Sequence, residues 1–270
     1  MFFSVKEQTI GGNFKSKPDA YNSEVLDKVQ YSINYQFHFL EKANDKSSLE
    51  KGFMVLQIGK EFVKFTDFYG LKNDSLAEVF SHYKTIGAKE LNERISIFKH
   101  IKFEKNIFTN IIDNKILFQS NVVHKFNYEY EIEIPKLEWK IEQKTDEILG
   151  YNVQRATVAY GGRKWIAWFT PEIPIQYGPY VFNGLPGLIV KLHDDKNNFT
   201  FLLNAIDKTE TDIYKRIYDN VTKTTKEKYM KVEKDFHDRP DMYFDNSAIR
   251  GGKGFSSSDK LPYNPIEVND

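Results

Sequence analysis

The side chains of this chain that could do chemistry are few and scattered. His193, Asp194 and Asp195 are adjacent and form the cluster that most resembles a set of metal ligands. They lie in the polar run His193–Asn198 between two apolar stretches, where Asp and Asn are favoured in turns, so we expect a turn here. The six histidines form no HExxH or HxH array. The sequence therefore predicts no metal site and no cofactor.

Three glutamates at every second position are the other candidate for chemistry. Glu129, Glu131 and Glu133 share one face of a predicted strand and could serve sugar or metal chemistry. Alternating charge is also what a sheet with one solvated face requires, and we favour that interpretation. The sequence contains no GxSxG, P-loop or dinucleotide fingerprint. No catalytic residue is predicted, and an enzyme is the less favoured class.

Composition argues against several classes of protein. Among 270 residues, 38 basic and 38 acidic side chains give a formal charge of zero, which disfavours nucleic acid or an anionic membrane as the main partner. The chain has no Cys, so disulfides, thiolate metal sites and cysteine nucleophiles are excluded. The opening residues, MFFSVKEQTIGGNF, contain neither a signal-peptide core nor a transmembrane span. We therefore expect a soluble chain.

The elements that must position any site are mainly strands. Apolar and polar residues alternate along 29–39 and again along 126–134, which is the period of a strand with one buried face. Gly161-Gly162, between Tyr160 and Arg163, predicts a two-residue hairpin turn. We expect a mainly β fold with some α structure: an antiparallel, strongly curved sheet or half-open barrel with packed helices.

Two regions show helical spacing instead. Apolar residues recur at three- and four-residue intervals near 74–100, which predicts a helical insertion with Asp74 or Ser75 as its N-cap. A second, Lys-rich helix is predicted near 211–236. The residues that support it are Tyr214, Ile217, Tyr218 and Val221.

These elements divide the chain into three parts. Residues 1–26 are an N-terminal lead-in, and residues 27–240 form a single β-rich domain. Residues 241–270 are rich in Gly, Ser and Asp, so we expect a flexible tail.

The segment Trp165–Leu192, WIAWFTPEIPIQYGPYVFNGLPGLIVKL, is the most constrained of the chain. Pro fixes φ and Gly permits positive φ, so the segment has a specified path between two apolar strands. Its turns would bring aromatic side chains together as a ligand-binding pocket. These side chains are Trp165, Trp168, Phe169, Tyr177, Tyr180 and Phe182. The alternative is that the loop plugs an open barrel or covers a sheet edge with these rings in the core, and the Gly/Pro pattern favours it.

Three stretches, GYNVQRAT, GRKWIAWFTPEIPI and GPYVFNGLPGLIVKL, resemble the GLPGLI family, a group of exported proteins of Gram-negative bacteria. The resemblance runs from about Gly150 to Ile206, with an echo in the residues Asn264–Glu267. The motif residues, for which it implies a structural role, are Pro171, Pro174, Gly178, Pro179, Gly184, Leu185, Pro186, Gly187, Leu188 and Ile189. The family has no established activity. The resemblance implies export to the periplasm or cell envelope with a signal peptide removed, and it names no catalytic residue.

Three functions remain as hypotheses. The leading one is a non-catalytic binding or accessory protein of the cell envelope, which holds a peptide, lipid or partner-protein segment near the Gly/Pro/aromatic loop. A hydrolase or metal-assisted enzyme is the second, and it predicts a cleft with converging carboxylates and a perturbed pKa. The third is a structural subunit of an outer-membrane complex. Expected partners are an envelope protein or a hydrophobic or peptide ligand, with no nucleic acid and no transmembrane segment.

Overall fold

The computed structural model describes residues 10–12, 14–122, 126–243, 256 and 258–268. Twelve strands form one large sheet in the order β10-β11-β12-β13-β14-β3-β4-β5-β7-β8-β9-β16. The first meander along the chain comprises β3 (Tyr31–Leu40), β4 (Leu49–Ile58), β5 (Phe62–Asp67), β7 (Lys105–Asn110), β8 (Lys115–Val122) and β9 (Phe126–Glu133). The second comprises β10 (Lys140–Ile148), β11 (Tyr151–Tyr160), β12 (Arg163–Thr170), β13 (Leu188–Asp194) and β14 (Phe199–Asp207).

Pairing between β14 and β3 joins the two meanders into one sheet. The pair is antiparallel and places Phe201 opposite Phe37. All other pairs of the large sheet are antiparallel too, except that β16 (Val221–Lys223) runs parallel to β9. Since alternating apolar residues of both meanders fall on one side, the joined sheet has one continuous apolar face.

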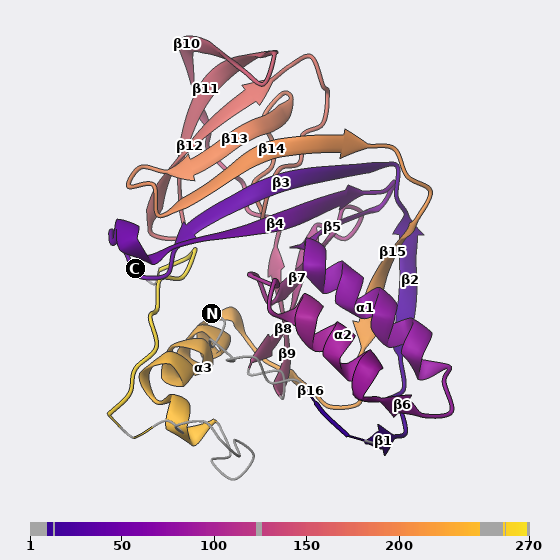
Figure 1. The fold of residues 1–270 in the computed structure, drawn as a ribbon. Helices are drawn as coiled ribbons and strands as arrows, with labels where there is room; N and C mark the ends of the chain where they lie inside the picture. The colour runs from indigo at the N-terminus through magenta and orange to yellow at the C-terminus, as the bar shows by residue number, and fades with distance from the viewer. Residues whose placement is uncertain (1–9, 13, 123–125, 244–255, 257, 269–270) are drawn as a thin grey trace.

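The sheet is strongly curved and not closed into a barrel, as expected from the sequence. In Figure 1 it runs from β10 at the top, through β3 and β4 across the middle, to β8 and β9 beside α3. The strands β10 and β16 end the sheet and do not pair with each other. Rings of the segment between β12 and β13 meet rings of distant strands on the concave side. The ring centres of Tyr180 and Phe118 of β8 are 5.9 Å apart, and those of Phe182 and Trp165 of β12 are 4.8 Å apart. The segment between β12 and β13 therefore fills the concave face.

The predicted hairpin and the predicted helical insertion are both present. β11 and β12 are joined by Gly161-Gly162, whose φ angles are 57° and 69°. The insertion holds α1 (Phe68–Ser81) and α2 (Ala88–Phe98), which pack on each other beside the sheet. No helix among the described residues is long and apolar enough to cross a membrane.

The N-cap predicted for α1 was placed about two turns too late. The cap is Asp67, whose Oδ1 accepts from the backbone N of Tyr69 at 2.7 Å, while Oδ2 accepts from Lys102 N at 2.7 Å. Asp74 lies inside the helix and pairs with Arg216 at 3.1 Å. Spacing of apolar residues alone did not locate the cap, because the polar residues Lys72 and Asn73 interrupt the stripe between Tyr69 and Leu76.

The predicted Lys-rich helix near 211–236 was wrong in its first half. That half is β15 (Asp212–Ile217), followed by β16, and α3 occupies only Lys226–Asp238. β15 pairs with β2 (Asn22–Lys28) to form a ribbon outside the large sheet, so the expected lead-in 1–26 also contains strand residues. Pairing with β2 overrides the local helical spacing, and it buries Ile213 completely.

The ribbon of β2 and β15 is fixed to the large sheet by a buried lysine. Lys64 of β5 donates to the carbonyl of Tyr214 at 2.9 Å, and its Nζ lies 3.9 Å from the centre of the Tyr214 ring. Burial lowers the pKa of Lys64 to about 8. These contacts explain why a Lys-rich segment folds against the sheet here.

Much of the expected flexible tail lies outside the described residues, but its residues 261–268 make contacts with distant elements. Residues 261–268, called the strap below, run from α3 to the turn of the β11–β12 hairpin. Leu261 N donates to His237 O at 2.8 Å, and Val268 N donates to Gly161 O at 2.9 Å. Composition suggested disorder, but these distant partners hold the strap in place.

Replacing Gly187 with alanine should destabilise the fold. A Cβ at this position would lie 2.0 Å from the carbonyl oxygen of Thr170, so backbone must move. We expect the free energy of unfolding in urea to fall by at least about 2 kcal/mol. Gly70 in α1 is the matched control, because its Cβ would meet Asp67 Cβ at 3.5 Å, an ordinary contact. Gly70→Ala should leave stability unchanged or raise it by up to about 1 kcal/mol, and an equal loss in both variants would contradict this account.

Candidate functional site

The aromatic residues predicted to bind a ligand lie mostly in the core. Trp165 is fully buried, and Trp168, Phe169, Tyr180 and Phe182 are buried as well, whereas Tyr177 is half-buried. Trp165 also donates its Nε1 to Tyr160 O at 3.1 Å. Of these six residues only Tyr180 lines the cavity described below. Their burial agrees with the alternative in which the loop acts as a plug.

A cavity of about 220 Å³ lies between the concave face of the sheet, α3 and the strap. Strands β3 and β8 supply one wall, and the segment 102–105 before β7 supplies another. α3 contributes Tyr229, Met230, Glu233, Phe236 and His237. The strap covers the remaining side with residues 262–267.

Phenylalanine rings form an apolar shelf along one side of the cavity. Phe37 stacks with Phe39 at 4.9 Å between ring centres. Phe103 meets Phe37 edge to face at 6.5 Å and Tyr180 at 6.4 Å. All four of these rings line the cavity. The shelf therefore offers a surface for an apolar or aromatic group.

Facing the shelf is a chain of polar groups that satisfy one another. Glu233 pairs with Lys105 at 2.8 Å and accepts from the hydroxyl of Tyr229 at 3.1 Å. Ser120 Oγ lies 2.6 Å from that hydroxyl. Burial alone would raise the pKa of Glu233, but the charge and hydrogen bond of Lys105 hold it below its usual value. Glu233 is therefore ionised near neutral pH.

Glu104 behaves in the opposite way. It also lines the cavity, and burial raises its pKa to about 7, with the charge of Glu233 adding to the rise and Lys105 opposing it. Two carboxyl groups in one cavity thus have well-separated pKa values. One further carboxyl group, that of Glu267, belongs to the strap.

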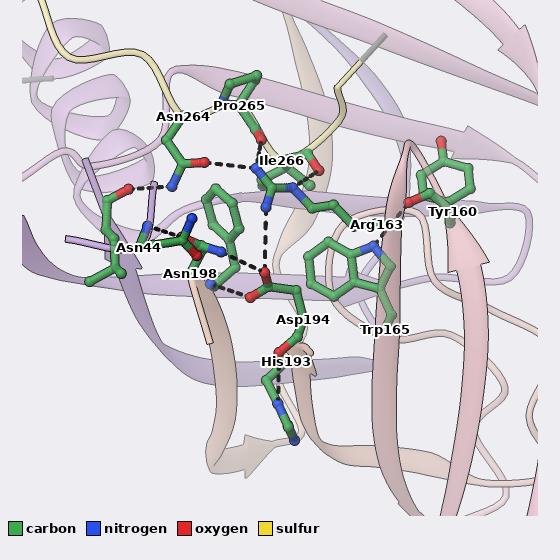
Figure 2. A network of polar contacts seen from close by, with 12 residues as sticks. Asn44, Tyr160, Arg163, Trp165, His193, Asp194, Asn198, Asn264, Pro265 and Ile266 are labelled. Atoms are coloured by element: carbon green, nitrogen blue, oxygen red, sulfur yellow. Dashed lines mark hydrogen bonds and ion pairs between the residues drawn. The ribbon is translucent and has the colours of Figure 1, made fainter. Parts of the chain in front are cut away.

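Arg163 anchors the strap to the hairpin, as Figure 2 shows. Its Nε donates to Ile266 O at 3.0 Å, and one Nη donates to both Pro265 O and Asn264 Oδ1 at 2.7 Å. The other Nη pairs with Asp194 at 3.4 Å. Asn264 Nδ2 in turn donates to Leu40 O at 2.6 Å, so the strap is tied to both meanders.

Glu267 is the second anchor of the strap. It is only 6% exposed, accepts a hydrogen bond from the hydroxyl of Tyr180 and pairs with Lys226. The hairpin turn must come close for this: a Cβ on Gly161 would lie 2.8 Å from Glu267 Cγ. Its φ is also 57°, so position 161 favours glycine both for the space available and for its backbone conformation.

The residues that the sequence singled out for metal or carboxylate chemistry do not form a site. Asp194 accepts from Phe199 N at 2.8 Å and from Asn198 Nδ2 at 2.9 Å, as a turn residue does. Glu131 pairs with Lys115 at 3.5 Å on the exposed side of β9. Within the described residues, no three His, Asp or Glu side chains are arranged to hold a metal ion.

Sequence reasoning missed the polar residues of the cavity. Glu104 and Lys105 lie more than a hundred residues before Glu233 in the chain, and no local pattern links the two segments. The run Asn264–Glu267 was noticed only as an echo of a family. No pattern in the sequence links this run to Gly161 and Arg163, its partners in the structure.

Comparison with known proteins gives a partial match. A family model described as a protein of unknown function (Porph_ging) matches residues 161–191. This stretch includes the hexapeptide Gly184–Ile189 and three partners of the strap, Gly161, Arg163 and Tyr180. Over these residues the chain is similar to that family. No curated protein matches the chain.

Solved structures resemble the fold at low identity. The structure of PNGF-II in a P21 space group shares 15% identity, covers 76% of this chain and 33% of its own, and gives a TM-score of 0.48. Its structure in a C2 space group gives the same identity, coverage of this chain and TM-score, with 32% of its own chain covered. This chain thus spans about a third of the length of these structures.

The raised pKa of Glu104 predicts a specific dependence of stability on pH. A folded-state pKa of about 7 against an ordinary value of 4.5 means that the folded protein binds this proton more tightly than the unfolded chain. The resulting stability is fully present below about pH 4.5 and is lost as the pH rises through 7. Between those values, wild type should lose on the order of 1–3 kcal/mol relative to Glu104→Gln.

Urea unfolding at stepped pH measures this difference. Glu131→Gln is the control, since Glu131 lies on the exposed side of β9, and its curve should run parallel to wild type. Parallel curves for wild type and Glu104→Gln would show that the carboxyl group is not desolvated in the folded protein.

Proposed function

We propose that this chain is a non-catalytic binding protein of the cell envelope that holds an apolar or aromatic group, from a small ligand or a partner peptide, in the cavity beneath the strap. The observation that carries the proposal is the cavity itself, about 220 Å³ beside a shelf of phenylalanine rings. An apolar cavity of about 150 Å³ is enough to bind benzene. The cavity therefore has room for a single ring or a branched apolar side chain.

The polar groups of the cavity support binding more than chemistry. Ser120, Tyr229, Glu233 and Lys105 form one connected set, in which each already has a partner at 2.6–3.1 Å. Groups that satisfy one another need nothing from a ligand, so the apolar shelf is left as the surface that a ligand gains by covering. Placement in the envelope rests on the resemblance to exported proteins.

Filling the cavity should abolish binding of a small aromatic probe. Val122 is buried and lines the cavity, so Val122→Phe places a ring in it. We expect fluorobenzene, followed by ¹⁹F NMR, to bind wild type and to lose at least about tenfold in affinity in this variant, since a filled cavity has no room for the probe. Val232→Phe on α3 is the control, because Val232 is not part of the cavity lining.

Two results would contradict the proposal. One is the absence of fluorobenzene binding to wild type at any concentration that the probe reaches in water. The other is equal loss in Val122→Phe and Val232→Phe, which would place the probe elsewhere. Circular dichroism and thermal unfolding of each variant separate these results from a failure to fold.

An acid–base enzyme is the second candidate, and the carboxyl groups of the cavity favour it. Glu104 stays protonated up to about pH 7 while Glu233 is ionised, which is the separation that a general acid and a general base need. These are different residues from the glutamates and the His193 cluster that the sequence suggested. The structural-subunit hypothesis has no comparable observation in its favour.

Hydrolysis of chromogenic substrates distinguishes the two candidates. 4-Nitrophenyl acetate, phosphate and β-glucoside would be assayed from pH 4 to 9 with wild type, Glu104→Gln and Glu233→Gln. Turnover above buffer that falls at least about a hundredfold in both variants would favour an enzyme. Equal rates in all three proteins would leave the binding function as the better account.

A further inference from the structure

The strap covers one side of the cavity without being part of the sheet. Among its described residues, 261–268, only Leu261 and Val268 donate backbone hydrogen bonds to the backbone of another element, at 2.8 and 2.9 Å. Between them, the strap is held through side chains: Arg163, Lys226, Tyr180 and His237 on its partners, and Asn264 and Glu267 of its own. Releasing it breaks no strand pair and no helix turn.

The contacts of the strap fall into two groups, one at Arg163 and one at Glu267. Arg163 donates to Asn264, Pro265 and Ile266. The carboxylate of Glu267 meets Tyr180 and, at the start of α3, Lys226, so one side chain joins two walls of the cavity. The next residue, Val268, is bonded to the hairpin turn at Gly161. Opening the strap therefore requires both groups to release, while the bond of Leu261 to α3 still holds its beginning.

We propose that the strap is a latch that regulates the cavity: ligand enters and leaves when the strap releases Arg163, Tyr180 and Lys226, and the sheet and α3 stay folded throughout. This inference rests on the proposed binding function, because it assigns a regulator to that cavity. Six strap residues, 262–267, line the cavity, so their departure opens one whole side of it. The latch sets the rates of exchange and leaves the apolar shelf unchanged.

Two full-length variants weaken the latch from opposite sides. Glu267→Gln keeps the size of the side chain but removes its charge, and Lys226→Met removes the cation while leaving the strap sequence intact. Glu131→Gln is the control: it breaks the exposed ion pair between Glu131 of β9 and Lys115 of β8, which is separate from the strap contacts. The chain has no Cys, so each protein can be handled without thiol exchange.

Amide hydrogen exchange of Val268 reports release of the latch. In both weakened variants it should be at least about tenfold faster than in wild type, since a hydrogen bond to a charged group is lost, while amides of β12 and β13 exchange as before. Fluorobenzene exchange measured by ¹⁹F NMR should accelerate by a similar factor, and Glu131→Gln should change neither rate.

Each contrary result has a distinct meaning. If Val268 exchanges only as slowly as the sheet amides in all proteins, the strap does not open separately and the latch is overturned. If Val268 exchange accelerates but fluorobenzene exchange does not, the strap opens without controlling entry, and the latch is again overturned while binding stands. If fluorobenzene binds none of the proteins, the proposed binding function fails and its regulation with it.

Discussion

Packing of the segment between β12 and β13 into the concave face of the sheet is the constraint on which the rest of the structure depends. A sheet that curves without closing leaves an apolar hollow, and this segment fills it. Phe182 packs against Trp165 of β12, and Tyr180 packs against Phe118 of β8. Two neighbouring residues thus touch opposite halves of the sheet. These two contacts hold the halves of the sheet at a fixed curvature, because closely packed side chains resist displacement.

The Gly and Pro residues of the segment act through shape. Gly178 lets the chain pass Ile189, since a Cβ there would lie 2.6 Å from Ile189 Cδ1. Gly187 passes still closer to the backbone of Thr170. The loop can therefore lie flat in the hollow and send Tyr180 toward the cavity. The ring of Tyr180 belongs to the core, and its hydroxyl belongs to the closing contact at Glu267.

Local rules predicted what local interactions decide. The hairpin was predictable because its two-residue turn requires positive φ, which Gly161 and Gly162 adopt readily. The mainly β sheet was predictable from long alternating stretches. The spacing of Tyr214 and Ile217 misled because β2, almost two hundred residues earlier, pairs with that stretch. The tail misled because Arg163 binds oxygens about a hundred residues further along the chain. The carboxyl groups of the cavity were invisible for the same reason: α3 brings them together only by packing on the sheet.

The position of the strap in the chain affects when the cavity closes. β16, the last strand among the described residues, ends at Lys223, and the strap begins at Leu261, 38 residues later. The strap therefore follows, along the chain, every described strand and helix that lines the cavity. Docking of the strap requires the β11–β12 hairpin and the end of β3 to be in place, because Gly161, Arg163 and Leu40 hold it there. The cavity is therefore covered only after the two meanders have joined.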